Sequence, residues 1–510
     1  MSSNAANWFV ERHLGEGRGD KVAFKEAWSG GRELSYGALA QQSSEVAAAL
    51  GSAGIHREER AAMFVLDQLE FPCIFWGALK AGVQPVALNT LLSTDVYRTI
   101  LNDCRAAISF VSVELLDIVL PAAKDSPYLR KIVVIGGDAP AGTISWVEFM
   151  KDATPMSAIE CCGDEIAFWL YSSGSTGNPK GVRHVHDALR VTCDTYGSKV
   201  LGIREDDTIY SAAKLFFAYG LGNGMSFPQA VGATALLYNA RPTPESVSAI
   251  LEEHKPTIFC GVPTLYAALV HRWEEGAVPD APLRICISAG EALPAELGRK
   301  WKALQGSDIM DGVGSTELLH IFLSNSPNDI EYGTSGVAVP GYEVRLVDET
   351  GANIEEGAIG ELLVKGDSAA ADYWNQRTKS RSTFEGEWTR TGDKYEMSKS
   401  GRMIYCGRTD DMFKVSGIWV SPFEVEQALM AHPDVLEAAV VARRDEDDLE
   451  KPQAFVVLKD GRDAKAVGGL KDFVKERIGK WKYPRWIDIL DELPKTATGK
   501  IQRFKLREPS

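Results

Sequence analysis

The sequence lacks the features of a membrane-spanning, secreted or nucleic-acid-binding protein. No apolar run approaches the roughly 20 residues that cross a bilayer, and the start, Met1 to Trp8, has neither the basic head nor the apolar stretch of a secretory signal. The formal net charge of -15 leaves no excess of basic residues for a nucleic-acid or anionic membrane surface. We therefore expect a cytoplasmic protein with neither nucleic acid nor membrane as a partner.

Cysteine is scarce too. Eight cysteines are scattered over the chain without a Cys-x-x-Cys pair. That density is too low for a disulfide scaffold, so we expect reduced thiols, most of them buried. The hydrophobic share of 45% and the charged share of 25% are ordinary for a globular enzyme. A chain of 510 residues exceeds what one hydrophobic core normally supports, so two or more domains are expected.

What is present is first of all an alternation of strands and helices. The stretch from Ala61 to Leu88 predicts strand, helix, strand, and the pattern recurs through residues 131–301. This predicts an α/β fold with layered, mostly parallel sheets and helices on both faces. Ligands in such sheets bind beyond the carboxyl ends of the strands. Antiparallel strands predicted at Glu343–Val347 and Ile359–Val364 would add a small antiparallel module.

The last hundred or so residues predict a separate small α+β domain. Ser421-Pro-Phe-Glu424 is a capping box with proline at the first helical position. Strands predicted at 438–441 and 454–458 flank an acidic loop and precede another helix. We therefore predict a large N-terminal domain over residues 1–408 and a small C-terminal domain over 409–510.

A loop rich in glycine and hydroxyl groups, Tyr171 to Gly181, follows a predicted strand at Ile166–Leu170 and precedes a helical pattern. Its backbone N–H groups, its hydroxyls and Lys180 can together bind an oxyanion. It is not a Walker loop, because Lys180 is followed by glycine instead of serine or threonine. A flexible surface turn is the alternative, since serine, glycine, asparagine and proline are the ordinary residues of turns.

Four further short motifs follow along the chain, and each is weak alone. A carboxylate and a hydroxyl in the first would suit a hard cation whose other ligands are phosphate oxygens and water. A Thr-Gly-Asp sequence is more often a turn, and a terminal lysine usually lies in solvent. The motifs are Asp311-Gly-Val-Gly-Ser-Thr-Glu317, Thr391-Gly-Asp393, Gly407-Arg-Thr-Asp-Asp411 and Pro494 to Arg503.

Taken together and in this order, the five motifs resemble those of the acyl-adenylate-forming enzymes, which include acyl-CoA synthetases, amino-acid adenylation domains and luciferases. The resemblance covers essentially the whole chain and implies ATP, Mg²⁺ and coenzyme A. The residues it implies for ATP are Ser172, Ser173, Gly174, Ser175, Thr176, Gly177, Lys180, Gly290, Glu291, Ala292, Asp311, Gly312, Thr316, Asp393, Arg408 and Lys500. Val313 departs from the family pattern, which usually has an aromatic residue there.

Within this set, the resemblance implies catalytic roles for Lys180, Thr316, Glu317 and Lys500, with Glu317 holding the metal. It makes Asp410 a hinge about which the small domain rotates between two half-reactions. The residues implied for CoA are Lys414, Ser416, Gly417 and Trp419.

Two segments, Lys214 to Asn223 and Gly314 to Asn325, resemble the acyl pocket of benzoate-CoA ligases and of their hydroxybenzoate and aminobenzoate relatives. Aromatic and small residues there predict a flat apolar slot. The implied ring-binding residues are Phe217, Ala218, Tyr219, Gly290, Gly314, His320 and Ile321. Two alternatives stay open: Phe216 and Phe217 as core residues, and His320 as a structural histidine. The first segment has no aspartate to pair with an α-ammonium group, which disfavours an amino-acid substrate.

The implied activity is that of an AMP-forming acid-thiol ligase, which converts benzoate or a substituted benzoate to its CoA thioester through an acyl-adenylate. Free CoA is the expected acceptor, because no carrier-domain motif follows in the sequence. One alternative is a ligase for an aryl-acrylate or a medium-chain fatty acid; another is a nucleotide-binding module without catalysis. The ring substituents, the CoA nucleotide contacts, the thiol's base and the oligomeric state, including a homodimer, are left open.

Overall fold

The computed structural model describes residues 4–172, 179–409, 411–415, 418–446, 449–459, 468–480, 482–495 and 501–507, with the backbone alone at 414, 418 and 419. The chain divides into two compact units. The first comprises Met1–Glu343 and Val364–Thr389, and the second comprises Val344–Leu363 and Arg390–Ser510. The predicted division between residues 408 and 409 stays a prediction, and its hinge residue, Asp410, lies outside the described residues.

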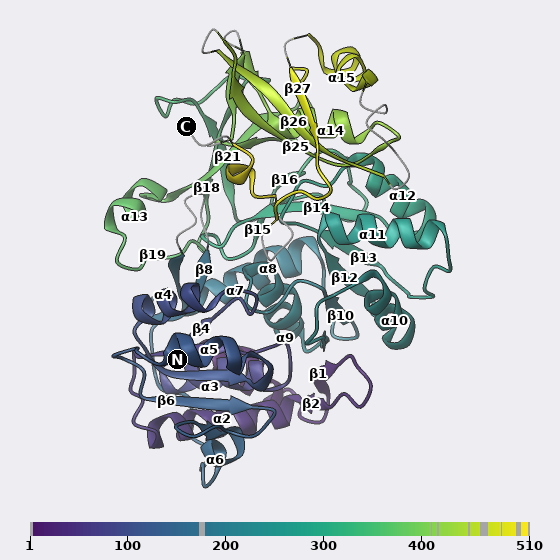
Figure 1. Ribbon diagram of the computed structural model, residues 1–510. Coiled ribbons are helices and arrows are strands. Elements are labelled where there is room, and N and C mark those ends of the chain that lie inside the picture. The colour runs from purple at the N-terminus through teal and green to yellow at the C-terminus, as the bar shows by residue number, and fades with distance from the viewer. Residues whose placement is uncertain are drawn as a thin grey trace. The chain divides into compact units, whose positions relative to one another are not determined.

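One sheet of the first unit has eight strands (Figure 1). Its central strands β8, β4, β3, β5 and β6 are parallel, whereas β9 runs antiparallel to β8 and β19 antiparallel to β9. In spatial order the strands are β19 (Asp372–Tyr373), β9 (Lys180–Val185), β8 (Ile166–Ser172), β4 (Gln84–Ala87), β3 (Arg60–Phe64), β5 (Ala106–Ser112), β6 (Lys131–Ile135) and β7 (Ile144–Ser145).

Helices cover both faces of this sheet. Phe168 and Trp169 are neighbours in β8, so their side chains point to opposite faces. The Phe168 ring lies 5.4 Å from that of Phe75 in α3 (Glu70–Ala81). Trp169 belongs instead to the core packed under α4 (Thr94–Cys104) and α5 (Leu116–Ala123).

Helix α2 (Tyr36–Ser52) packs closely along α3. Ser35 caps its N-terminus by accepting a hydrogen bond from the Ala38 N–H at 3.1 Å. Gly77 of α3 permits the close approach, because a Cβ atom there would lie 2.6 Å from Val46. The neighbouring short helices are η1 (Asn7–Glu11), α1 (Arg12–Gly15), η2 (Val113–Leu115) and α6 (Trp146–Met150).

The other large sheet of the first unit has nine strands. Strands β14, β13, β12, β10, β11 and β1 are parallel, and the outer strands β15, β16 and β2 are antiparallel. In spatial order they are β16 (Val337–Ala338), β15 (Ile321–Ser324), β14 (Ile309–Gly314), β13 (Ile285–Ser288), β12 (Ile258–Gly261), β10 (Thr208–Ser211), β11 (Thr234–Leu237), β1 (Val22–Glu26) and β2 (Glu33–Ser35).

Three helices pack on this sheet around Tyr266, Trp273 and Trp301; they are drawn in teal in Figure 1. They are α10 (Pro244–His254), α11 (Pro263–Glu274) and α12 (Ala295–Gln305). The first unit also contains α7 (His186–Thr192), η3 (Cys193–Val200), α8 (Ala218–Leu221), η4 (Gly222–Ser226), α9 (Phe227–Val231), α13 (Arg377–Thr383) and β20 (Phe384–Glu385). α8 and the start of η4 lie in the first of the two segments that the sequence predicts to line an acyl pocket.

The second unit is built mainly from antiparallel strands. Strands β17 (Glu343–Val347), β18 (Ile359–Lys365), β21 (Trp388–Met397) and β22 (Met403–Arg408) are neighbours in one sheet, and β23 (Phe413–Val415) pairs with β24 (Ile418–Val420). A further sheet holds β25 (Val435–Arg444), β26 (Glu450–Leu458) and β27 (Trp486–Ile489), whose core includes α14 (Pro422–Met430) and α15 (Leu470–Ile478); η6 is Arg503–Lys505.

The predicted fold class is confirmed, with two corrections in detail. The βαβ unit lies where expected, as β3, α3 and β4. The phosphate loop, however, does not lead from a strand straight into a helix, because β9 intervenes. Its residues Lys-Gly-Val-Arg-His-Val give a short, partly charged alternation that the glycine-rich loop obscures. A strand predicted at Asp308–Met310 would end before the Asp311 motif, whereas β14 continues into that motif as far as Gly314.

Candidate active site

The ends of the predicted phosphate loop are held by strand pairing. Ser172 in β8 lies opposite Lys180 in β9. The Lys180 side chain is 9% exposed, and its Nζ lies 5.5 Å from the ring centroid of Tyr373. The rest of the predicted loop, Ser173, Gly174, Ser175, Thr176 and Gly177, lies outside the described residues.

Glu317 lies in the short connection between β14 and β15. Its Oε1 accepts a hydrogen bond from the Tyr373 hydroxyl at 2.8 Å, and its main-chain carbonyl accepts one from the Ala370 N–H at 2.7 Å. The carbonyl of Thr316 accepts from the Leu319 N–H at 3.2 Å. Leu319 has a φ of +65°, a conformation that is rare for a residue with a side chain. Lys180 and Glu317 therefore contact the same tyrosine, which the sequence reasoning missed.

A buried carboxyl group and a glycine turn lie beside this connection. Asp311 in β14 pairs with Ser288 at the end of β13. Its Oδ2 accepts from the Leu293 N–H at 3.4 Å, while Oδ1 has no hydrogen-bond partner among the described residues. Burial raises the pKa of Asp311 well above its usual value. Gly290 follows β13 with a φ of +97°, so the backbone through Glu291 and Ala292 turns toward Asp311.

Tyr219 lies across the carboxyl ends of two parallel strands. Its hydroxyl is 3.2 Å from the carbonyl oxygen of Gly261 in β12 and 3.0 Å from that of Ile287 in β13. Phe217 stands just before α8, with its ring 4.4 Å from the ring of Phe216, and Ala218 opens that helix. The predicted acyl-pocket segment therefore lies where an open α/β sheet ordinarily binds its ligand.

His320 is buried against aromatic rings. Its ring centroid lies 4.5 Å from that of Phe227, 5.3 Å from that of Tyr196 and 5.8 Å from that of Tyr219. Nε2 is 3.4 Å from the Tyr219 carbonyl oxygen, and Nδ1 has no partner among the described residues. Burial lowers the pKa of His320 to about 3, so the imidazole is neutral near pH 7.

Glycines fix the positions of the residues around His320. A Cβ atom at Gly314 would lie 2.4 Å from the His320 carbonyl oxygen, and one at Gly222 would lie 2.3 Å from the imidazole Cδ2. A Cβ atom at Gly312 would lie 3.0 Å from the Ile321 side chain. Gly222 was missed by the sequence reasoning, because a glycine inside a helical pattern gives no sign of what packs against it.

The second unit contains Asp393 and Arg408, two of the predicted ATP-binding residues. Nη1 of Arg408 donates to Oδ1 of Asp393 at 2.9 Å and to the carbonyl of Thr391 at 3.1 Å. A Cβ atom at Gly392, whose φ is +73°, would lie 2.9 Å from Nη2 of Arg408. Lys414 pairs with Trp419 in the β23–β24 hairpin, where only their backbone is described. Ser416, Gly417 and Lys500 lie outside the described residues.

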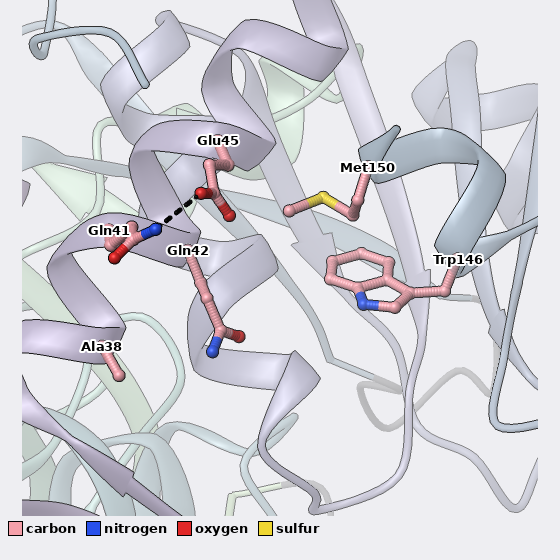
Figure 2. A pocket seen from close by; sticks show the side chains of 6 residues that line it. All are labelled: Ala38, Gln41, Gln42, Glu45, Trp146 and Met150. Atoms are coloured by element: carbon pink, nitrogen blue, oxygen red, sulfur yellow. Dashed lines mark hydrogen bonds between the residues drawn. The ribbon is translucent and has the colours of Figure 1, made fainter. Parts of the chain in front are cut away.

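The first unit also has two cavities away from these residues. One, of about 340 Å³, lies between α2 and α6; Figure 2 shows the Glu45 carboxylate, which accepts from Gln41, on the side opposite Trp146 and Met150. The other, of about 400 Å³, includes Arg60, Trp169 and Trp374 in its lining. No predicted site residue that the structure describes lines either cavity, so neither is the candidate active site.

The donor set of the site fits a hard cation only in part. Among the described residues, no group of three or more His, Cys, Asp or Glu side chains could hold a metal ion. Glu317 offers one oxygen, because Tyr373 already donates to the other. Mg²⁺ accepts such a set, since it commonly takes one or two carboxylates and completes its shell with phosphate oxygens and water.

Two expectations from composition can be compared with the structure. All eight cysteines are free, and most are buried, as predicted. Within the described part of the chain, no helix combines the length and the apolar character needed to traverse a bilayer.

Comparison with known proteins decides the family. The AMP-binding enzyme pattern matches residues 10–374, and the C-terminal domain pattern of the same enzymes matches residues 424–500. The chain belongs to the AMP-binding enzyme family. This confirms the resemblance that the five motifs indicated.

Several members of this family are closely similar over the whole chain. The 4-hydroxybenzoate-CoA/benzoate-CoA ligase of Rhodopseudomonas palustris is 52% identical over 511 residues, covering 99% of this chain and 94% of that protein. The structure of a benzoate-CoA ligase from Burkholderia xenovorans matches with a TM-score of 0.91 at 46% identity, covering 100% of both chains. An anthranilate-CoA ligase in complex with anthranoyl-AMP matches with a TM-score of 0.93 at 40% identity, covering 99% of this chain and 96% of that one.

Proposed function

We propose that this protein is an AMP-forming aryl-CoA ligase that converts benzoate or a substituted benzoate to its CoA thioester. The similar proteins that act on benzoate, 4-hydroxybenzoate and anthranilate support this substrate class. Family membership supports ATP and CoA as the co-substrates. ATP and CoA are cytoplasmic metabolites, which favours a cytoplasmic location.

The observation that carries the proposal is the short connection from Gly314 to Ile321. Its first half, which contains Thr316, presents Glu317 to the hydroxyl of Tyr373, whose ring also meets Lys180. Its second half places His320 among aromatic rings beneath Tyr219. One connection thus joins a charged region suited to phosphates with an apolar region suited to a benzene ring, and the reaction needs these two regions side by side.

In the proposed first half-reaction, the aryl carboxylate attacks the α-phosphate of ATP and pyrophosphate leaves. Two anions must approach each other, so cationic groups have to offset their repulsion. Lys180 and the loop from Ser172 hold the departing phosphates, and Lys500 neutralises the carboxylate and the α-phosphate. Mg²⁺ bound to Glu317 would add positive charge at the phosphates. One unit-charge pair at roughly 4 Å contributes about 4 kcal/mol at an effective dielectric of about 20.

Around the nucleotide, Asp311 and the turn from Gly290 to Ala292 form the adenine side of the proposed site. Oδ1 of Asp311 supports this role, because it is buried without a hydrogen-bond partner among the residues that the structure describes, and such an oxygen suits the amino group of a purine. Asp393 would bind the ribose hydroxyls, with Arg408 holding its carboxylate.

In the proposed second half-reaction, the CoA thiol attacks the acyl-adenylate and AMP leaves. The small domain would rotate about Asp410, withdraw Lys500 and present the Lys414 to Trp419 hairpin to the pantetheine arm. Asp410→Pro should therefore spare adenylate formation and block thioester formation. CoA turnover that survives this change would refute the rotation.

The product nucleotide tests the proposal as a whole. Purified protein with ATP, Mg²⁺, CoA and benzoate should release AMP and pyrophosphate and form benzoyl-CoA. Release of ADP would indicate a kinase or ATPase instead, and ATP binding without acid-dependent pyrophosphate release would indicate a module without catalysis. A panel of benzoates, aryl-acrylates and medium-chain fatty acids, compared by kcat/KM, identifies the acid.

A further inference from the structure

A segment outside all five motifs holds two of them together. Tyr373, in the two-residue strand β19, is 4% exposed. Its hydroxyl donates to Glu317 Oε1 at 2.8 Å, while the Lys180 Nζ lies 5.5 Å from its ring centroid. The phosphate-loop lysine and the metal-binding glutamate of the proposed site thus share one phenol side chain.

Tyr373 is itself firmly anchored on the phosphate-loop side. β19 pairs with β9, so that Tyr373 lies opposite Val182 and Asp372 opposite Arg183. Arg183 and Asp372 form a two-pronged ion pair at 2.7 and 2.6 Å. The Trp374 N–H donates to the Gly181 carbonyl at 2.8 Å, directly beside Lys180.

The same segment is anchored on the glutamate side as well. The Ala370 N–H donates to the Glu317 carbonyl at 2.7 Å, and the Ser368 hydroxyl donates to the Leu318 carbonyl at 2.8 Å. The backbone at Glu317 and its carboxylate are therefore both fixed from residues 368–373. Movement of one motif relative to the other would have to break these contacts.

We propose that Tyr373 is a positioning residue, which holds the Glu317 carboxylate and the Lys180 ammonium in the arrangement that receives a magnesium-nucleotide complex. The inference rests on the proposed function, in which Glu317 binds Mg²⁺ and Lys180 binds phosphate. A phenol that donates to a carboxylate makes a charge-assisted hydrogen bond and restricts that carboxylate to one rotamer. The other oxygen is then left for the cation, and the ring face attracts the ammonium.

Tyr373→Phe tests this role, because it removes the hydroxyl and keeps the ring and the backbone of β19. The first measurement is calorimetric binding of a non-hydrolysable ATP analogue, with Mg²⁺ and with a chelator. In the wild type, Mg²⁺ should lower the Kd of the analogue. We call the ratio of the Kd without Mg²⁺ to the Kd with Mg²⁺ the Mg²⁺ gain. In Tyr373→Phe, we expect the Mg²⁺ gain to fall about tenfold, which corresponds to about 1.4 kcal/mol. In the adenylation assay, kcat should fall and half-saturation by Mg²⁺ should rise, with the KM for benzoate unchanged.

Tyr342→Phe is the matched control. The Tyr342 hydroxyl makes a 2.6 Å hydrogen bond to the Ser368 hydroxyl in the same segment, whereas Glu317 accepts from Tyr373. This variant should lower thermal stability to a similar extent and leave the Mg²⁺ gain at its wild-type value. A similar loss of the Mg²⁺ gain in both variants would mean that Tyr373 has only a structural role, and the proposal would fail.

A double-mutant cycle with Glu317→Gln separates positioning from general loosening of the fold. If Tyr373 acts through Glu317, adding Tyr373→Phe to Glu317→Gln should cause no further loss of the Mg²⁺ gain. Additive losses would overturn the proposal even if either variant is less stable. Failure of the proposed function would look different, because the wild-type protein would then form no AMP from any aryl acid.

Discussion

In the first unit, the residues proposed to bind the aryl ring (the aryl side) and those proposed to bind phosphate (the phosphate side) meet opposite requirements. On the aryl side, Tyr219 and His320 are packed into a buried cluster, and burial keeps the imidazole neutral. On the phosphate side, Tyr373 contacts Lys180 through its ring face and Glu317 through its hydroxyl. A neutral ring needs water excluded, whereas an anionic nucleotide needs cations already oriented toward it.

Burial acts strongly on two parts of the proposed site, the aryl side at His320 and the adenine side at Asp311. Burial shifts the pKa values of His320 and Asp311 toward their uncharged forms. On the phosphate side, where Lys180 is also largely buried, the Tyr373 ring and hydroxyl face the ammonium and the Glu317 carboxylate. Perturbing the two sides separately should therefore have separable effects.

The largest effect is expected from removing the cation that the second unit contributes to the proposed reaction. Lys500→Ala should lower the rate of adenylate formation by about a thousandfold, because the variant loses one cation near two anionic reactants. The thioester step, started from presynthesised benzoyl-adenylate, should keep most of its rate. Pyrophosphate release and benzoyl-CoA formation, measured separately, check this. An equal loss in both steps would show that Lys500 does not act in the first step alone.

The next largest effect is expected on the aryl side. Gly222→Ala would place a methyl group 2.3 Å from His320, so the imidazole or the backbone around it must shift and the predicted slot must change shape. We expect kcat/KM for benzoate to fall about a hundredfold, or about 2.7 kcal/mol, with binding of the ATP analogue unchanged. Gly224→Ala is the control, because its Cβ atom would meet the end of the Leu215 side chain at 3.0 Å, which can move. Weakened nucleotide binding in Gly222→Ala would contradict the separation of the two sides.

A smaller effect concerns the pH dependence of stability. Burial lowers the pKa of His320 to about 3, below its value of about 6.5 in the unfolded chain. The unfolded chain therefore binds the proton first, and stability is lost as the pH falls from about 6.5 toward 3, by up to about 1.4 kcal/mol per pH unit for this histidine.

Replacing His320 should remove that share of the slope. Chemical denaturation at pH 5 to 8 should give a shallower loss of unfolding free energy in His320→Gln and His320→Asn. The two variants should share the same slope even if their absolute stabilities differ. His184, whose pKa burial also lowers to about 3, should maintain part of the wild-type slope. An unchanged slope in both variants would refute the assignment to His320.

The smallest effect is expected from Tyr219→Phe. The change removes a hydroxyl that bonds to strand-end carbonyls and keeps the aromatic wall. We expect a loss of about 1 kcal/mol in unfolding free energy and less than about a tenfold rise in the KM for benzoate. A loss of adenylation much larger than this would mean that the hydroxyl contacts the reactants. Tyr219 would then do more than line the aryl pocket.

Much of this protein could be predicted from local patterns. The βαβ unit, the helix capped by Ser421 and the alternation that defines the α/β fold follow from apolar periodicity and capping residues, which act over a few positions. The antiparallel strand β9 was missed because a glycine-rich loop and charged residues obscure its short alternation. The roles of the motif residues stay predictions, and Asp410 and Lys500 lie outside the described residues.

The sequence by itself determined the family and the order of the nucleotide-binding motifs, because glycine, hydroxyl and carboxylate groups at fixed spacing are local properties. Only the tertiary structure decided which residues support them: Tyr373 beside Glu317, Gly222 against His320, and Tyr219 across two strand ends. These contacts join segments far apart in the chain. They arise from sheet pairing and close packing between segments, which cannot be recognised from the residue at any single sequence position.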